Sequence, residues 1–190
     1  MSAKKQSFVI YLLGSPGVGK YTIATEIARQ ANAVVVDNQL VNTPILTLLN
    51  WDGISQLPAD VWDRIEPIRE AVFSFMKDSA PRSINYVLTN ALEDDGGESQ
   101  EIFDRVKSIA DCREAVFLPV HIKCDPEEQL KRVSTEQRKK RLKMSEPDQL
   151  VDYLATVVTL IPEDPNLFTL DVTELSPQEA AQRILKQVML

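Results

Sequence analysis

The sequence predicts an α/β fold in which helices cover both faces of a parallel sheet of five strands. Three observations lead to this prediction. Short apolar runs alternate along the chain with longer segments whose apolar residues recur at helical spacing. Glycine, proline and acidic residues separate the two kinds of segment. The length of 190 residues suits one hydrophobic core rather than two, so we expect a single domain over residues 1–190.

The expected strands are almost wholly apolar, which is typical of parallel strands buried on both faces. They occupy residues 8–14, 33–37, 84–90, 115–124 and 167–172. Pro119 lies inside the fourth run, where we expect a bulge or local irregularity.

The segments between the strands are expected to be helical. They are residues 22–32, 41–50, 60–77, 99–112, a helix that begins after Asp125, residues 150–161 and a final helix after Ser176. Asp125 and Ser176 are each followed by proline and then, three residues on, by Glu128 or Glu179. This spacing predicts a capping box at both helix starts.

The composition narrows the possible functions. The net charge of −7 disfavours a protein that coats nucleic acid, which needs a basic surface. We expect no nucleic-acid partner and no membrane span, since no segment is long enough, and residues 8–13 are too short for a secretory signal. Cys112 and Cys124 form no metal-binding pair, so we interpret them as thiols of a cytoplasmic protein. His121, the only histidine, lies in an apolar strand.

The segment after the first strand carries the pattern G-x-x-x-x-G-K and is followed by a helix. It reads Gly14-Ser15-Pro16-Gly17-Val18-Gly19-Lys20-Tyr21-Thr22. Glycines let the backbone curl so that successive N–H groups point inward, and the helix start adds a positive dipole end. Lys20 would supply a cation for the β- and γ-phosphates. The segment is therefore predicted to be a phosphate-binding loop (P-loop) for a nucleoside triphosphate, with ATP and Mg²⁺ as the expected cofactors.

One position departs from the P-loop pattern. The Ser or Thr that usually follows the lysine and holds Mg²⁺ is replaced by Tyr21. Three interpretations stay open: acids elsewhere hold the metal through water, Thr22 takes over by a local shift, or metal binding is weak and turnover slow. We favour the first. Asn90, at the end of the third strand, is expected to order a metal-bound water.

Two further charged residues are candidates for the acceptor side of the site. Asp37 ends the second strand, where a carboxylate can orient an attacking hydroxyl or accept its proton. We predict it to be the general base, although a turn or helix cap is the alternative. Arg69, on the long helix before the third strand, is a candidate for binding an acceptor phosphate or carboxylate, or else a plain surface arginine.

A dense basic cluster extends from Lys131 to Lys143 in this acidic chain. Arg138 and Arg141 are three residues apart and would share a helix face. A lid that closes over a triphosphate needs such cations for the charge that develops during phosphoryl transfer. The alternative is a solvated helix face.

The stretches GSPGVGKYT, VVVDNQL, VLTN and RVSTEQRKKRLKMSEPDQL together resemble the small P-loop kinases of the nucleoside-monophosphate-kinase and shikimate-kinase type. Within that group the chain is most similar to members described only as ATP-binding or shikimate-kinase-like. The resemblance implies a three-layer P-loop NTPase fold with strand order 2-3-1-4-5, an acceptor-binding insertion at about 38–81 and a lid at about 134–147. It also implies that Lys20 and the loop amides bind ATP, that Asp37 faces the acceptor, and that Arg138 or Arg141 closes over the phosphates.

The leading hypothesis is an ATP-dependent phosphotransferase that acts on a small-molecule or nucleotide acceptor. The alternative is a regulatory protein that binds nucleotide with little catalysis, which Tyr21 and the lack of an acid at Asn90 favour. A kinase of nucleic-acid ends is disfavoured by the net charge. The sequence selects neither the acceptor, nor ATP over GTP, nor an oligomeric state.

Overall fold

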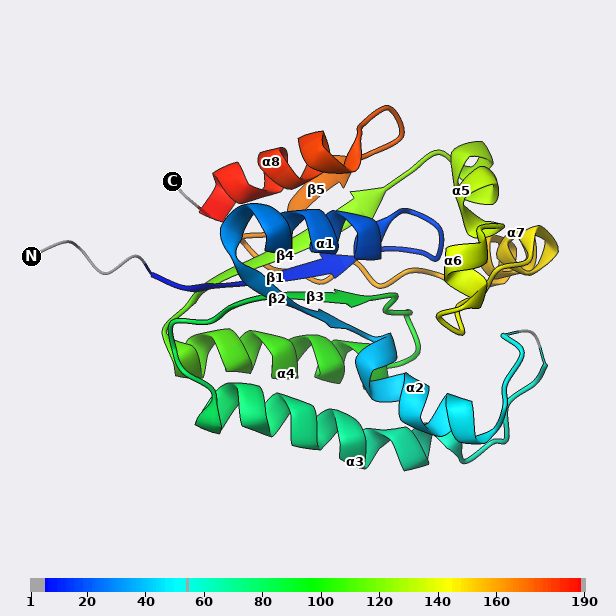
Figure 1. Ribbon diagram of the computed structural model, residues 1–190, viewed down its shortest axis with the longest axis horizontal. Coiled ribbons are helices and arrows are strands. Elements are labelled where there is room, and N and C mark those ends of the chain that lie inside the picture. The colour runs from blue at the N-terminus through cyan, green and yellow to red at the C-terminus, as the bar shows by residue number, and fades with distance from the viewer. Residues whose placement is uncertain (1–5, 54, 189–190) are drawn as a thin grey trace, which may run out of the picture.

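The computed structural model describes residues 6–53 and 55–188, and its centre is a parallel sheet (Figure 1). The strands are β1 (Phe8–Leu13), β2 (Ala33–Asp37), β3 (Asn85–Asn90), β4 (Val116–Lys123) and β5 (Phe168–Asp171). Their order in the sheet is β2-β3-β1-β4-β5, and every pairing is parallel. The predicted fold class, the five strands and their order are confirmed.

Helices cover both faces of the sheet. They are α1 (Lys20–Ala31), α2 (Gln39–Leu48), α3 (Val61–Ser74), the π-helical turn η1 (Phe75–Ser79), α4 (Glu98–Arg113), α5 (Pro126–Val133), α6 (Glu136–Lys139), α7 (Pro147–Thr156) and α8 (Pro177–Val188). Figure 1 shows α1 and α8 on one face, α3 and α4 on the other, and α5 to α7 beside the carboxyl ends of the strands. Within the described residues, no helix is both long and apolar enough to cross a membrane.

The central strand explains why the sequence shows apolar runs rather than alternation. Ile10 and Leu12 of β1 pack in a cluster with α1 and α8, whereas Val9, Tyr11 and Leu13 pack in a second cluster with α4. All five side chains are buried. A strand that is covered on both faces must be apolar at every position, which is the pattern that predicted a parallel sheet.

Two expected features differ in the structure. The predicted helix 150–161 is instead Pro147–Thr156, because the chain beyond it pairs with the segment after β3. Asp94 N donates to the Val158 carbonyl (2.8 Å), and Leu160 N donates to the Leu92 carbonyl (2.9 Å). Pro119 causes no bulge, since the register between β1 and β4 continues through it and β5 begins only opposite Val120. Its missing N–H therefore removes no bond from the ladder.

The two predicted capping boxes form to different extents. Asp125 caps α5 by accepting a hydrogen bond from Glu127 N (2.9 Å), but Glu128 binds Arg132 instead of returning to the cap. Ser176 and Glu179 form the complete box, because each side chain accepts a hydrogen bond from the other's backbone N–H. Arg132, in the last turn of α5, pairs with Glu128, so this glutamate does not complete the predicted capping box.

A buried arginine holds the π-helical turn against β3. The guanidinium of Arg113, at the end of α4, is 2% exposed and stacks 4.8 Å from the ring centroid of Tyr86. It donates hydrogen bonds of 2.6 to 3.2 Å to the carbonyls of Met76, Ala80, Pro81 and Ile84. The Arg113 side chain thus donates hydrogen bonds to carbonyls of an irregular connection, which have no partner in a helix or a sheet.

We predict that Arg113→Met lowers the free energy of unfolding by about 3 kcal/mol or more, because buried carbonyls lose their donors. Urea denaturation followed by circular dichroism measures the change. Arg64→Met is the matched control, because its ion pair with Asp60 is exposed (72% and 58%) and its loss should change stability by less than about 0.5 kcal/mol. Equal effects of the two substitutions would contradict the assigned role of Arg113.

Candidate functional site

The P-loop connects β1 to α1 at the carboxyl edge of the sheet and is pressed against β4 and α5. Gly14 has φ +144°, and a Cβ there would lie 2.5 Å from the carbonyl oxygen of Ile122. Gly17 has φ +89°, and its Cβ would lie 3.1 Å from the carbonyl oxygen of Gln129. The glycines at these two positions are therefore required both by the backbone conformation and by close approach to neighbouring backbone.

Lys20, the first residue of α1, folds back over the loop. Its Nζ donates to the carbonyls of Gly14 (2.5 Å) and Ser15 (2.8 Å). Burial lowers the pKa of Lys20 to about 7, and the positive charges of Lys143 and Arg138 add to this effect against the opposing charge of Asp37. The Lys20 ammonium is thus buried beside other positive charges, so binding of an anion next to it would be strongly favoured.

A buried glutamine fixes the P-loop to α5. Ser15 Oγ donates to Gln129 Oε1 (2.9 Å), and Gln129 Nε2 donates to the Cys124 carbonyl (2.7 Å). Gln129 is only 4% exposed. Gln129 is not among the residues predicted from the sequence, where its one signal is a polar side chain on the buried face of an amphipathic helix.

Asp37, at the end of β2, is buried and accepts hydrogen bonds on both carboxylate oxygens. Thr89 Oγ1 donates to Oδ1, Arg141 Nη2 donates to Oδ2 (2.8 Å), and Lys143 Nζ lies 3.0 Å from both oxygens. Burial alone would raise the pKa of Asp37, but the charge of Lys143 and the three donors outweigh it and hold the pKa below its ordinary value. The carboxylate therefore binds the basic segment that follows α5 and does not cap α2.

The aromatic ring of Tyr21 lies against the same two cations. Arg141 Cζ is 3.6 Å from the ring centroid, and Lys143 Nζ is 5.0 Å from it. The guanidinium of Arg141 thus contacts the ring through cation–π attraction and Asp37 through an ion pair. The residues of the basic cluster differ in burial. Arg138, Arg141 and Lys143 are half-buried, whereas the intervening Lys139 and Lys140 are exposed to solvent.

These residues surround a cavity of about 380 Å³ between the P-loop, the ends of β2 and β3, α2 and the segment 132–144. Its lining contains one acid, Asp37, and the five bases Lys20, Arg132, Arg138, Arg141 and Lys143. The tryptophans Trp51 and Trp62 line it as well. The cavity is therefore strongly positive beside the loop and partly aromatic.

The remaining predicted residues divide between the cavity and its surroundings. Thr22 and Asn90 line the cavity, but Arg69 does not, and its guanidinium pairs with Glu66 on its own helix. Arg138 lines the cavity and also donates to the Met144 carbonyl (2.9 Å). The structure thus gathers the P-loop, Asp37 and both predicted arginines and leaves Arg69 outside the lining.

The oxygen atoms around this cavity do not form a set that suits Mg²⁺, which has octahedral oxygen coordination and is usually bound through one or two carboxylates together with water and substrate phosphates. Both oxygens of Asp37 already accept from cations. Asn90 Oδ1 accepts from Ala91 N (2.9 Å), and its Nδ2 donates to Tyr11 Oη (3.3 Å). Across residues 6–53 and 55–188, no group of three or more His, Cys, Asp or Glu could hold a metal ion.

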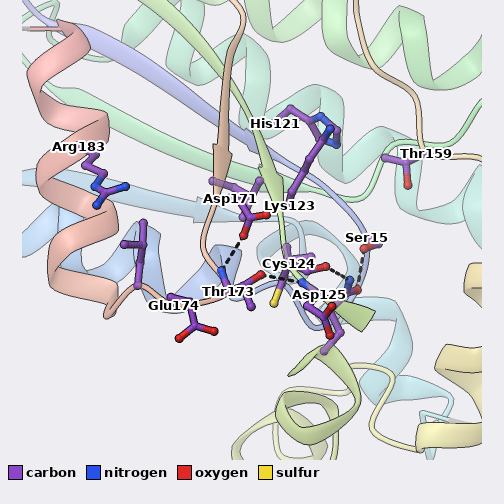
Figure 2. Close-up of a pocket in the computed structure, with 14 residues that line it drawn as sticks. Ser15, His121, Lys123, Cys124, Asp125, Thr159, Asp171, Thr173, Glu174 and Arg183 are labelled. Atoms are coloured by element: carbon purple, nitrogen blue, oxygen red, sulfur yellow. Dashed lines mark hydrogen bonds between the residues drawn. The ribbon is translucent and has the colours of Figure 1, made fainter. Parts of the chain in front are cut away.

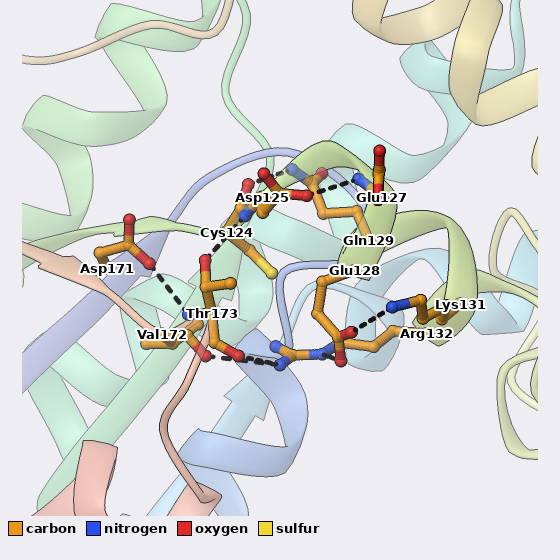
Figure 3. A network of polar contacts seen from close by, with 10 residues as sticks. All are labelled: Cys124, Asp125, Glu127, Glu128, Gln129, Lys131, Arg132, Asp171, Val172 and Thr173. Atoms are coloured by element: carbon orange, nitrogen blue, oxygen red, sulfur yellow. Dashed lines mark hydrogen bonds and ion pairs between the residues drawn. The ribbon is translucent and has the colours of Figure 1, made fainter.

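A second cavity, of about 850 Å³, lies beside the P-loop at the ends of β4 and β5. Figure 2 shows it between Ser15 of the loop and Arg183 of α8, with Thr173 and Glu174 of the β5–α8 connection along its edge. Arg132 of α5 reaches this connection and donates to the carbonyls of Val172 (3.4 Å) and Thr173 (3.2 Å) (Figure 3). The P-loop is therefore flanked by two cavities, and Arg132 links their walls.

Comparison with known proteins identifies the class of fold. No protein-family model matches the chain, and no curated protein sequence matches it. The solved structures that match it include several small kinases at 10 to 16% identity, and the chain shares their fold.

Three solved structures illustrate the likeness. A sugar kinase from Janibacter is 16% identical, with 96% of this chain and 95% of that chain covered and a TM-score of 0.62. A gluconokinase from Sinorhizobium meliloti is 14% identical, with 97% and 93% covered and a TM-score of 0.62. The APS kinase of Mycobacterium tuberculosis, solved with AMPPNP and APS, is 16% identical, with 97% and 99% covered and a TM-score of 0.56. These neighbours differ in acceptor, so the shared fold does not select one.

We predict that Lys20 titrates near pH 7 in the free protein and that ATP raises its pKa, because the phosphates favour the ammonium form. The charged form therefore dominates below pH 7, and above pH 7 binding must take up a proton. The apparent ATP affinity should then fall by up to about tenfold for each pH unit above 7.

Carbon-13 NMR of labelled lysine side chains measures this titration directly, and the signal that is absent from Lys20→Arg identifies the residue. Calorimetry at pH 8 in buffers of different ionisation enthalpy measures the proton uptake. A Lys20 midpoint near the ordinary 10.5 would contradict the prediction.

Proposed function

We propose that the protein is an ATP-dependent phosphotransferase that transfers a phosphoryl group to a small-molecule acceptor. The observation that carries this proposal is that the P-loop with Lys20 and the carboxylate of Asp37 line one cavity together with Arg138 and Arg141. Positioning and electrostatic stabilisation provide most of the catalysis in phosphoryl transfer, and this cavity supplies cations for both. The shared fold with ATP-analogue-bound APS kinase supports the same assignment.

The two cavities divide the substrates between them in this proposal. The phosphates of ATP would lie on the P-loop amides, with the nucleoside toward the larger cavity and the γ-phosphate toward Lys20. The acceptor would enter the smaller cavity from the side of α2. Ligands of open parallel sheets bind outside the carboxyl ends of the strands, and both cavities lie there.

Polar atoms of α2 suggest what kind of acceptor fits. Gln39 Oε1 and Asn42 Oδ1 are buried and have no hydrogen-bond partner among the described residues. Both residues line the smaller cavity together with Trp51 and Trp62. Amide oxygens accept hydrogen bonds from hydroxyl or N–H groups, and indole rings present flat apolar faces. We propose a hydroxyl-bearing acceptor with a ring, and an acceptor-binding role for the segment 38–81.

The basic segment acts as a lid in this proposal. In the free protein, Asp37 holds Arg141 and Lys143. The phosphates of ATP compete for these cations, so the lid at 134–147 would turn toward the nucleotide and release Asp37. The acceptor hydroxyl would then attack the γ-phosphorus while the bond to the β–γ bridging oxygen breaks. The hydroxyl proton would pass to Asp37 and on to solvent, leaving ADP and the phosphorylated acceptor.

We predict that a panel of nucleosides, sugars and hydroxylated antibiotics contains at least one acceptor that raises ADP formation above solvent hydrolysis in a coupled assay. Asp37→Asn should lower kcat by about 10²- to 10⁴-fold. It should not weaken ATP binding, because the lid cations lose a competing partner.

Asp104→Asn is the matched control, since this acid is exposed on α4 and does not line the cavity. If ATP binds but no acceptor raises ADP formation and Asp37→Asn changes no rate, the regulatory alternative replaces the phosphotransferase.

A further inference from the structure

We propose that this protein binds its nucleoside triphosphate without Mg²⁺, with Arg141 and Lys143 supplying the positive charge that the metal ordinarily brings. The inference rests on the proposed triphosphate site and specifies the form of the ligand, a metal-free polyanion.

Tyr21 occupies the position at which a P-loop usually provides its Mg²⁺ ligand. In a P-loop the hydroxyl after the lysine is the Mg²⁺ ligand, and here that side chain is the phenol ring of Tyr21. The ring faces a guanidinium at 3.6 Å and an ammonium at 5.0 Å. Arg141 and Lys143 thus contact Tyr21, the residue whose position in a P-loop faces the divalent ion.

The charge around the cavity supports the same inference. Five basic side chains face one acid, and that acid is already paired with Arg141 and Lys143. Arg141 and Lys143 belong to this lining whether they pair with Asp37 or with phosphate, and a divalent ion among the phosphates would repel both at close range in a partly desolvated site. A triphosphate without Mg²⁺ carries two more negative charges than its magnesium complex, and it therefore suits this lining better.

An unused donor of Arg141 supports it as well. Arg141 Nε is buried and has no hydrogen-bond partner among the described residues. Its Nη2 is the atom bound to Asp37 (2.8 Å). A buried N–H without an acceptor is costly, and a phosphate oxygen in the cavity would satisfy it with a charge-assisted bond. When the lid turns toward the nucleotide and Arg141 leaves Asp37, both Nε and Nη2 would become available to phosphate oxygens.

The test is calorimetric titration of the wild-type protein with a non-hydrolysable ATP analogue, in EDTA and in excess Mg²⁺. We expect binding in EDTA to be as tight as in Mg²⁺ or tighter. Tightening of tenfold or more on adding Mg²⁺ would overturn the inference and leave the phosphotransferase standing. No binding in either buffer by folded protein would overturn the proposed function itself.

Variants separate the role of the lid cations from general effects. Arg141→Gln and Lys143→Gln should each weaken metal-free binding at least tenfold and make binding depend more on Mg²⁺. Lys140→Gln is the matched control, because Lys140 belongs to the same basic run but is exposed and outside the cavity lining. Tyr21→Ser, which restores the hydroxyl, should increase the Mg²⁺ dependence. If none of these changes alters the ratio of the two affinities, the inference fails.

Discussion

The interaction on which the site depends is the ion pair network around Asp37. Its carboxylate is buried at the end of β2, where an unpaired charge would be very unfavourable, so it needs donors. Thr89 on the adjacent strand and the two cations Arg141 and Lys143 provide them. Because the cations belong to a segment far along the chain, their attraction to this one acid brings the basic run beside the P-loop, where it forms one wall of the small cavity.

Much of the fold could be predicted because its signals are local. Apolar runs that alternate with helical segments identify buried parallel strands, and the resemblance supplied their order. The end of α7 could not be predicted, because helical periodicity does not reveal that residues 157–160 pair with the backbone after β3. The same limit applies to Arg113, whose acceptors are the carbonyls of a π-helical turn that has no sequence signature.

The site shows the same division between local pattern and tertiary contact. The P-loop and Asp37 are visible from residues that directly follow strands, and the departure at Tyr21 is visible from the motif. The partners of Tyr21 are not, since the stacking of Arg141 on its ring joins residues 120 positions apart. Gln129 was missed for a similar reason, because its hydrogen bond with Ser15 forms only once α5 lies beside the loop.

The hydrogen bond between Ser15 and Gln129 connects α5 to the P-loop. α5 leads directly into the basic segment, and the side chain of Gln129 on α5 accepts a hydrogen bond from Ser15 of the P-loop. A rotation of α5 that accompanied movement of the basic segment would pull on Ser15 and alter the direction of the amides around it. If the basic segment acts as the proposed lid, this hydrogen bond would couple its movement to the conformation of the phosphate-binding loop.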